Sequence, residues 1–324
     1  MIRTEKGMSR AEFLRAATAS ALSLALGPTL AARAAQKSAN AETTGRRNPM
    51  HKRLIPSTGE SLPIIGCGTW QTFDVGAGEA ELAPLKEVLR ILFAAGGSVI
   101  DSSPMYGRSE QVVGEILAEL RAEEKAFIAT KVWTQGRSAG IQQMNDSAQL
   151  LRKQRLDLMQ IHNLVDWRTH LKTLRDWKAS QKIRYIGITH YTSTAYDQLE
   201  SIMRSEQLDF IQLNYSLADR QAERKLLGLA ADRGMAVLVN QPFGGGALVR
   251  KLANVPLPSW AAEIECENWA QILLKYVIGH PAVTCAIPGT RRPQHMLENC
   301  GVGAGTLPDE TFRKRMAAWW DQRA

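Results

Sequence analysis

Val99-Ile-Asp-Ser-Ser-Pro-Met-Tyr-Gly-Arg-Ser-Glu110 begins as an apolar strand and continues as a polar loop. Its Ser-Ser-Pro segment ends the strand directly after Asp101, and Gly107 frees the backbone before the next helix begins. The segment therefore places a carboxylate, Asp101, and a phenol, Tyr106, at the carboxyl end of a strand. Open α/β sheets and α/β barrels carry their chemistry at that end.

The rest of the chain repeats this pattern of a strand followed by a helix. The strand-like runs are rich in β-branched residues and almost uniformly apolar, as strands buried on both faces should be. They span residues 64–69, 98–102, 126–132, 156–161, 183–189, 210–214, 236–240 and 283–288. The helix-like runs span residues 82–95, 110–120, 142–151, 169–181, 193–205, 221–233, 268–279 and 293–300. Eight such units predict an α/β protein of the (β/α)8 TIM-barrel class, which typically has ~250 residues.

Segments outside the eight units complete the prediction. Residues 52–65 predict an N-terminal β-hairpin, residues 244–260 a loop after the seventh strand, and residues 309–324 a C-terminal extra helix. A doubly wound sheet is the alternative fold. It requires a glycine-rich phosphate turn, but Gly66-Cys-Gly68 is followed by Thr69-Trp70 rather than by a third glycine and a helix. The dinucleotide-binding fingerprint is therefore absent.

The amino terminus has the features of an export signal. A basic start leads into an apolar run, residues 16–26, that is too short to span a bilayer, and Ala32-Arg33-Ala34 is a cleavage pattern. Ser9-Arg-Ala-Glu-Phe-Leu-Arg15 resembles the twin-arginine motif, with Ala11 in place of the second arginine. We predict a signal peptide at 1–35, a linker at 36–50, a barrel at 51–324 and a periplasmic protein. A cytoplasmic enzyme whose first residues form an amphipathic surface helix is the alternative.

The composition excludes several classes of function. Hydrophobic residues make up 44% of the 324 residues, which supports a large core. The net charge is +8, of which the first 35 residues contribute +3, and the remaining basic residues are dispersed. Because the basic residues are dispersed and the sequence has no nucleic-acid motif, we interpret them as part of a solvated surface rather than as a binding site for nucleic acid or a membrane. Four cysteines without a CxxC spacing show no zinc or dithiol motif. Cys67 and Cys285 lie in strand-like runs and are expected in the core.

Polar side chains close almost every predicted strand. Asp101 and Tyr106 follow the second strand, Lys131 closes the third and His162 follows the fourth. Taken alone, each residue could have a purely structural role: Lys131 could form a structural ion pair, and His162 could be a hydrogen-bonded histidine in the core. Their convergence on one barrel face favours an active site. The later strands end in Thr189 and His190, in Gln212 with Asn214 and Tyr215, in Asn240 to Phe243, and in Pro288 to Arg292.

These residue types suit proton transfer to a carbonyl oxygen. A phenol titrates near ~10 unaided, and we expect Lys131 to lower the pKa of Tyr106 by stabilising its anion. Asp101 would pair with Lys131, and His162 would orient the substrate oxygen beside Tyr106. The site contains no covalent nucleophile and no metal-ligand cluster, so the electrons must come from a bound donor. Hydride from a nicotinamide is the natural source.

The motifs resemble those of the aldo/keto reductase superfamily over roughly residues 50–300. The resemblance is carried by six segments with matching order and spacing. They are D-x-x-x-x-Y-G at 101–107, A-T-K-V around Lys131, I-H-N at 161–163, I-G-I-T-H at 186–190, F-I-Q-L-N-Y at 210–215 and I-P-G-T-R-R-P…E-N at 287–299. The resemblance implies a carbonyl reductase or alcohol dehydrogenase that uses NADP(H) and a small carbonyl substrate.

The resemblance also implies roles for individual residues. The catalytic tetrad would be Asp101, Tyr106, Lys131 and His162. Cofactor-binding positions fall into two groups. The nicotinamide end would be held by Thr189, His190, Gln212 and Phe243. The adenosine end would be held by Pro288, Gly289, Thr290, Arg291, Arg292, His295, Glu298 and Asn299.

Four positions depart from the family pattern. The family usually has Ser-Asn where this chain has Thr189-His190, and an aromatic residue that stacks on the nicotinamide often stands in the place of Asn240. His295 occupies a position often held by arginine. Phe243 is a candidate replacement for the stacking residue. These departures keep open a second function, that of a low-turnover NADP(H)-binding regulatory or accessory protein. A hydrolase on the same barrel lacks the paired carboxylates or metal ligands that it would need.

Overall fold

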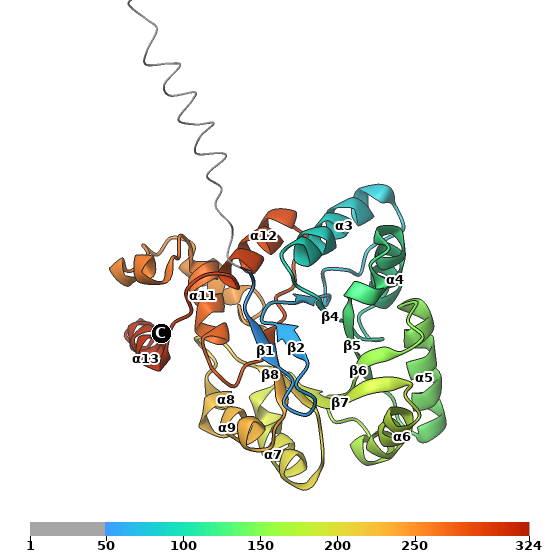
Figure 1. The fold of residues 1–324 in the computed structure, drawn as a ribbon. Coiled ribbons are helices and arrows are strands. Elements are labelled where there is room, and N and C mark those ends of the chain that lie inside the picture. Colours follow the sequence, from blue (N-terminus) through green and yellow to red (C-terminus); the bar gives the residue numbers. More distant parts are fainter. Residues whose placement is uncertain (1–48, 324) are drawn as a thin grey trace, which may run out of the picture. The chain divides into compact units, whose positions relative to one another are not determined.

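The computed structural model describes residues 49–323, so the predicted signal peptide at 1–35 lies outside the described residues, as does nearly all of the linker at 36–50. Eight parallel strands form one sheet in which each strand pairs with the next along the chain (Figure 1). They are β3 (Cys67–Gly68), β4 (Val99–Asp101), β5 (Phe127–Val132), β6 (Leu156–His162), β7 (Ile183–His190), β8 (Phe210–Asn214), β9 (Ala236–Asn240) and β10 (Cys285–Ala286).

Two isolated parallel bridges, Ile65 with Ala286 and Gly68 with Gly289, join the first strand to the last and close the barrel. A Cβ atom on Gly68 would lie 2.7 Å from the carbonyl oxygen of Ile287, so only glycine permits this approach. The Gly66-Cys-Gly68 segment thus serves barrel closure. The predicted (β/α)8 fold is confirmed, although β3 and β10 are shorter than predicted.

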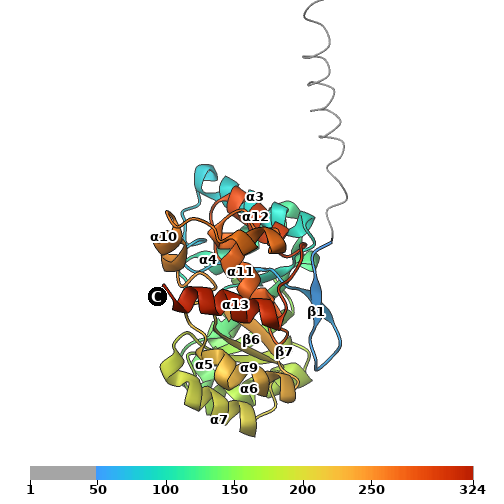
Figure 2. The ribbon, with the colours of Figure 1, turned by 90° about the vertical axis from the view of Figure 1, so that its left-hand side faces the viewer.

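Helices surround the strands (Figures 1 and 2). Those of the eight units are α3 (Glu79–Ala94), α4 (Ser109–Leu120), α5 (Arg137–Leu150), α6 (Trp167–Ala179), α7 (Tyr196–Ser205), α8 (Gln221–Arg224) with α9 (Leu226–Asp232), α11 (Trp269–Ile278) and α12 (Pro293–Val302). Short 3-10 turns lie at Glu123–Lys125, Ser193–Ala195 and Ser259–Ile264. In α3 the buried residues recur at helical spacing and face the sheet: Leu82, Leu85, Val88, Leu89 and Leu92.

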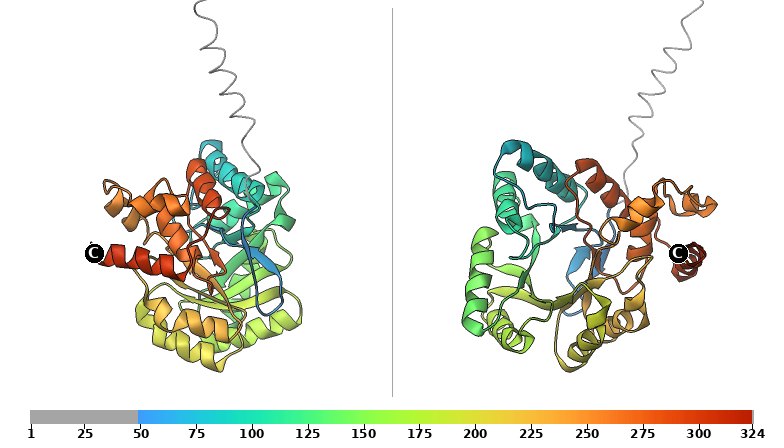
Figure 3. Two further views of the ribbon diagram at one scale, coloured as in Figure 1. Left: turned by 60° about the vertical axis from the view of Figure 1, so that its left-hand side comes forward. Right: turned by 180° about the vertical axis from the view of Figure 1, so that it is seen from behind.

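The predicted hairpin is present as β1 (Lys52–Leu54) and β2 (Ser61–Pro63), paired antiparallel. Figure 1 shows it in front of the ring of strands. Its Ile55 and Leu62 belong to the core cluster inside the barrel, together with Phe127 and Phe210, which open β5 and β8. The hairpin therefore covers the amino-terminal end of the barrel. The carboxyl end, seen from behind in the right-hand view of Figure 3, is left for chemistry.

Two parts of the prediction need correction. Residues 244–260 are not a continuous loop, because they contain α10 (Ala247–Leu252). Gly244, Gly245 and Gly246 all have positive φ and form the turn, and the Ala-Leu-Val-Arg-Lys-Leu run that follows has high helix propensity. The predicted helix at 221–233 is two helices, because Lys225 leaves the helical conformation.

The predicted C-terminal helix is α13 (Glu310–Asp321), and Asp309 caps it by accepting a hydrogen bond from the Phe312 amide at 2.8 Å. Trp320 is buried, and the Trp319 ring lies 4.7 Å from that of Trp269 in α11. Cys67 and Cys285 are buried and free, as expected for small core residues, and Cys266 and Cys300 are buried and free as well. Within residues 49–323, no helix has the length and apolar character needed to cross a membrane.

Candidate active site

A buried ion pair lies at the centre of the barrel's carboxyl half. Lys131, on β5, is fully buried and places its Nζ 2.8 and 2.9 Å from the two carboxylate oxygens of Asp101 on β4. It also donates to the Ser102 carbonyl at 2.6 Å. Burial lowers the pKa of Lys131, but the groups around it, Asp101 first and then Tyr106 and Glu110, together raise it above its ordinary value. Lys131 is therefore a fixed cation in a dry environment.

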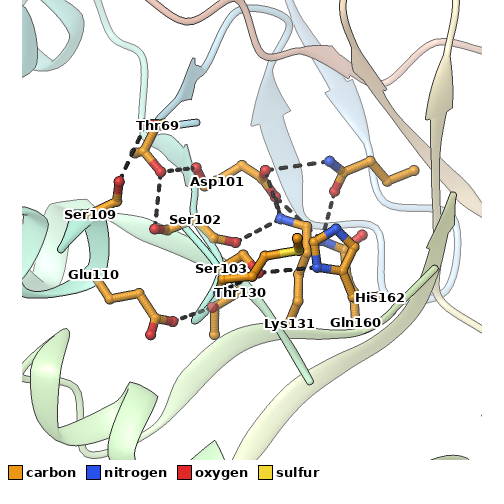
Figure 4. A network of polar contacts seen from close by, with 12 residues as sticks. Thr69, Asp101, Ser102, Ser103, Ser109, Glu110, Thr130, Lys131, Gln160 and His162 are labelled. Carbon is orange, nitrogen blue, oxygen red and sulfur yellow. Dashed lines mark hydrogen bonds and ion pairs between the residues drawn. The ribbon is translucent and has the colours of Figure 1, made fainter. Parts of the chain in front are cut away.

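Two glutamine amides complete the surroundings of Asp101, and Figure 4 labels one of them, Gln160. Gln212 Nε2 donates to Asp101 Oδ1 at 3.3 Å, and Gln160 Nε2 lies 3.4 Å from Oδ2 and 2.7 Å from Gln212 Oε1. Burial raises the pKa of Asp101, while Lys131 and the two amides act against it. The Gln160 side chain has room inside the barrel because its register partner on β7 is Gly187, which has no side chain. A Cβ atom at Gly187 would lie only 3.0 Å from Gln160 Cγ.

Tyr106 lies beside this pair, on the loop between β4 and α4. The Lys131 ammonium is 5.1 Å from the centroid of its ring, and the His162 ring meets it edge-on with centroids 5.9 Å apart. The structure thus brings together the four residues of the proposed tetrad. It places them at the end of the barrel opposite the hairpin.

The expected direction of the Tyr106 pKa shift was wrong. Burial raises the pKa of Tyr106 above its ordinary value, and the attraction of Lys131 offsets only part of that rise. The physical reason is that the loss of hydration of a phenolate outweighs one nearby cation. The phenol is therefore protonated at neutral pH, which is the state that a proton donor needs.

His162 is a neutral imidazole. Burial, with the charge of Lys131 and the proximity of His190, lowers the pKa of His162 to about 2. Its Nδ1 lies 3.1 Å from Ser103 Oγ, which itself accepts from the Met105 amide at 3.4 Å. The Ser103 hydroxyl hydrogen is then free to donate to Nδ1, which leaves the proton of the imidazole on Nε2. A neutral Nε2–H can donate a hydrogen bond to a substrate oxygen.

Two of the residues predicted at the nicotinamide end, Thr189 and Gln212, lie in the same layer of the barrel as His162. Thr189 is buried, and its register partners are His162 on β6 and Gln212 on β8. His190 is half-buried at the end of β7, and its ring stacks on Tyr191 with centroids 5.6 Å apart. Phe243 is partly buried and packs on the core after β9. Gln212, however, already donates to Asp101, so a cofactor contact there must share its amide.

Residues predicted at the adenosine end lie beyond β10 and on α12. Gly289 forms a parallel β-bridge with Gly68, and Asn299 is buried. Thr290 Oγ1 accepts a hydrogen bond from the Arg292 amide at 3.0 Å and lies 3.5 Å from His295 Nδ1.

The other residues predicted at this end contact the chain itself. The exposed Arg291 donates a hydrogen bond to the Gln71 carbonyl at 2.9 Å. Glu298 accepts from Gln294 one turn earlier at 2.9 Å, so it faces along α12. Pro288 accepts from the Gly68 amide at 3.3 Å.

The residues that the sequence did not single out are Ser103, Gln160 and Glu110. Glu110 is buried at the start of α4 and accepts from Thr130 on β5 and from Ser147 on α5. Burial raises its pKa. For Gln160 a usable signal existed, because it lies in the Met-Gln-Ile-His run two residues before His162 and therefore on the same side of β6.

Unsatisfied acceptors mark the carboxyl end of the barrel. Within residues 49–323, buried side-chain atoms without a hydrogen-bond partner include the amide oxygens of Asn163, Asn214 and Asn240, which follow or close β6, β8 and β9. Buried polar groups are normally paired, so such atoms call for a partner outside the chain. A group with N–H donors that binds at this end of the barrel fits them. The exposed Trp70 and Trp133 come just after β3 and β5, at the same end of the barrel.

Comparison with known proteins gives a consistent result. The sequence model of the Aldo/keto reductase family matches residues 64–319. The methylglyoxal reductase YeaE of Escherichia coli K12 is 29% identical over 262 residues, which cover 78% of this chain and 90% of that protein. The NADH-specific methylglyoxal reductase of the same organism is 27% identical over 246 residues, covering 65% and 73%.

Solved structures share the fold. The aldo-keto reductase from Klebsiella pneumoniae in complex with NADPH superposes with a TM-score of 0.71 at 23% identity, covering 84% of this chain and 96% of that one. The glycerol dehydrogenase from Gluconobacter oxydans gives a TM-score of 0.70 at 21% identity, with the same coverage.

Proposed function

This chain belongs to the aldo/keto reductase family, and from that premise we propose that it reduces aldehydes or ketones to alcohols with NADPH, with Tyr106 as the proton donor. The observation that carries the proposal is the buried Lys131–Asp101 pair next to Tyr106 and the neutral His162. The unsatisfied amide oxygens at the same end of the barrel fit the carboxamide of a nicotinamide.

NADPH, when bound, supplies the hydride for the carbonyl carbon. His162 donates a hydrogen bond from Nε2 to the substrate oxygen and holds it beside Tyr106. As negative charge develops on that oxygen, the Tyr106 hydroxyl transfers its proton to it. The Lys131 cation stabilises the phenolate that remains, and Asp101 keeps that cation in place.

Methylglyoxal is the first substrate to test, because curated relatives are named methylglyoxal reductases. Purified protein with NADPH and methylglyoxal should show a steady fall in absorbance at 340 nm and an equal amount of hydroxylated product. A panel of larger aldehydes would then define the substrate range. A protein that bound NADPH but turned over none of these carbonyls would be an accessory protein rather than a reductase.

We further propose that Arg291 and Arg292 select NADPH over NADH. Both are exposed after β10, where barrels commonly hold phosphate, and two guanidinium groups suit a 2′-phosphate. Replacing both with alanine is expected to weaken NADPH binding at least ~10-fold, as expected for lost charge-assisted hydrogen bonds, and to leave NADH binding nearly unchanged. Fluorescence titration with each cofactor measures the two dissociation constants. Equal constants in the unmutated protein would contradict the proposal, and one relative is indeed NADH-specific.

The predicted export signal leads to a separate proposal, that the enzyme folds and loads NADP(H) in the cytoplasm and is exported to the periplasm. An unfolded chain threaded across a membrane would arrive without a cofactor made inside the cell. Replacing Arg10 with lysine is expected to trap folded, NADPH-competent enzyme in the cytoplasm, whereas Arg15→Lys is the matched control and should be exported. Cell fractionation and sequencing of the mature amino terminus measure this. A protein found only in the cytoplasm and still beginning near Met1 would rule out export.

A further inference from the structure

We propose that the amide oxygens of Asn214 and Asn240 together accept the two N–H bonds of the nicotinamide carboxamide, an inference that rests on the proposed function. The two asparagines would supply amide-oxygen acceptors in this chain, which has His190 where the family usually has an asparagine.

The placement of the two residues follows from the sheet. Asn214 closes β8 and Asn240 closes β9, and they are register partners in the parallel ladder. Partners in such a ladder project their side chains to the same side. Gln212, two residues before Asn214, reaches Asp101 inside the barrel, so both asparagines project inward, one layer nearer the carboxyl end.

Both amide oxygens are unpaired. Each is buried and has no hydrogen-bond partner among residues 49–323. The Asn214 amide cannot simply be reversed, because its Nδ2 donates to the carbonyl oxygen of Tyr191 and a reversed amide would place two oxygens together. Its free oxygen is therefore fixed in orientation by the β7–α7 loop.

The end of the neighbouring strand, β7, supplies a hydrogen-bond donor rather than an acceptor. His190 Nδ1 accepts from the Thr192 amide at 3.2 Å, so a neutral ring at this position carries its proton on Nε2. Burial lowers the pKa of His190, which favours that neutral ring. A carboxamide has one carbonyl acceptor and an NH2 group with two donors. His190 and Thr189 can meet the carbonyl, and the two asparagine oxygens are suited to the NH2 group.

A carbonyl substrate does not satisfy the same pair. Its reacting oxygen carries lone pairs and no hydrogen, so two amide oxygens would repel it rather than bind it. The two acceptors therefore favour the cofactor over the substrate. The proposal also gives a reason for an asparagine at 240, where the resemblance leads one to expect an aromatic ring.

The test compares NADP+ with its 3-acetylpyridine analogue, in which a methyl group replaces the carboxamide NH2 and removes both donors. Isothermal titration gives the two dissociation constants without any turnover. Wild-type protein is expected to bind NADP+ at least ~10-fold more tightly, because the analogue leaves buried acceptors unpaired. In the double variant Asn214→Leu with Asn240→Leu, the ratio of the two constants should fall to near one.

Three further measurements make the result decisive. Asn145→Leu, the same change at an exposed site on α5, should retain the wild-type ratio, and Asn240→Asp, which keeps an acceptor, should retain most of it. Thermal unfolding would show whether the double variant is folded. A wild-type ratio near one, or an unchanged ratio in the folded double variant, would overturn the proposal while NADP+ binding and the reductase assignment remained intact. If neither nucleotide bound to the wild-type protein, the proposed function itself would fail.

Discussion

Replacing Tyr106 with phenylalanine is expected to lower kcat for carbonyl reduction by at least ~100-fold, the effect of removing a general acid. The change deletes one oxygen and keeps the ring that packs against His162, so NADPH affinity should stay close to the wild-type value. Steady-state kinetics and fluorescence titration on the same preparation separate the two quantities.

Tyr185→Phe is the matched control for this variant. The Tyr185 hydroxyl contacts Thr58 and Glu60 at the hairpin end of the barrel, far along the strands from the tetrad. Its loss should leave kcat unchanged. If Tyr106→Phe retained wild-type turnover, or if both variants lost activity equally, Tyr106 would not be the proton donor.

Replacing Lys131 with methionine is expected to affect both activity and folding. The Asp101 carboxylate would remain buried without its cation, and breaking a buried ion pair from one side costs about 3–5 kcal/mol of folding free energy. Turnover should fall at least as far as in Tyr106→Phe, because the phenolate formed on proton transfer would lose its only adjacent cation among the tetrad residues. Urea unfolding and kcat measure the two effects.

The double variant Asp101→Asn with Lys131→Met distinguishes chemistry from folding. It removes both charges, so most of the lost stability should return, since an unpaired buried charge is no longer present. Activity should not return. Recovery of turnover together with stability would show that Lys131 serves only to hold the barrel together.

Much of the fold could be predicted because its signals are local. Eight apolar strands, the hairpin at residues 52–65 and the apolar spacing of α3 are each visible within a short window of sequence. The helix α10 was missed because three glycines and nearby prolines gave the segment the composition of a loop. The closing role of Gly68 depends on Ile287, more than two hundred residues away, which no local pattern reveals.

The site was predicted less completely than the fold. Strand ends identify which polar residues meet at the barrel's carboxyl end, and Asp101 and Lys131 do meet there. The direction of the Tyr106 pKa shift was not predictable, because it is a balance between burial and one cation, and burial depends on the packed structure. The parts played by Ser103 and Gln160 likewise depend on hydrogen bonds between strands distant in sequence.

In the proposed mechanism a phenol, and not an imidazole, gives the proton to the carbonyl oxygen. Single-turnover reduction of methylglyoxal by enzyme preloaded with NADPH, followed from pH 5 to pH 10.5, distinguishes the two donors. Because the pKa of Tyr106 is raised and that of His162 is lowered to about 2, neither group changes protonation across the neutral range. The rate should therefore be flat and fall only at the alkaline limit, near or above the ordinary phenol pKa of ~10. A rate that instead falls with a midpoint between pH 6 and 7 would identify a histidine as the proton donor and contradict the assignment of Tyr106.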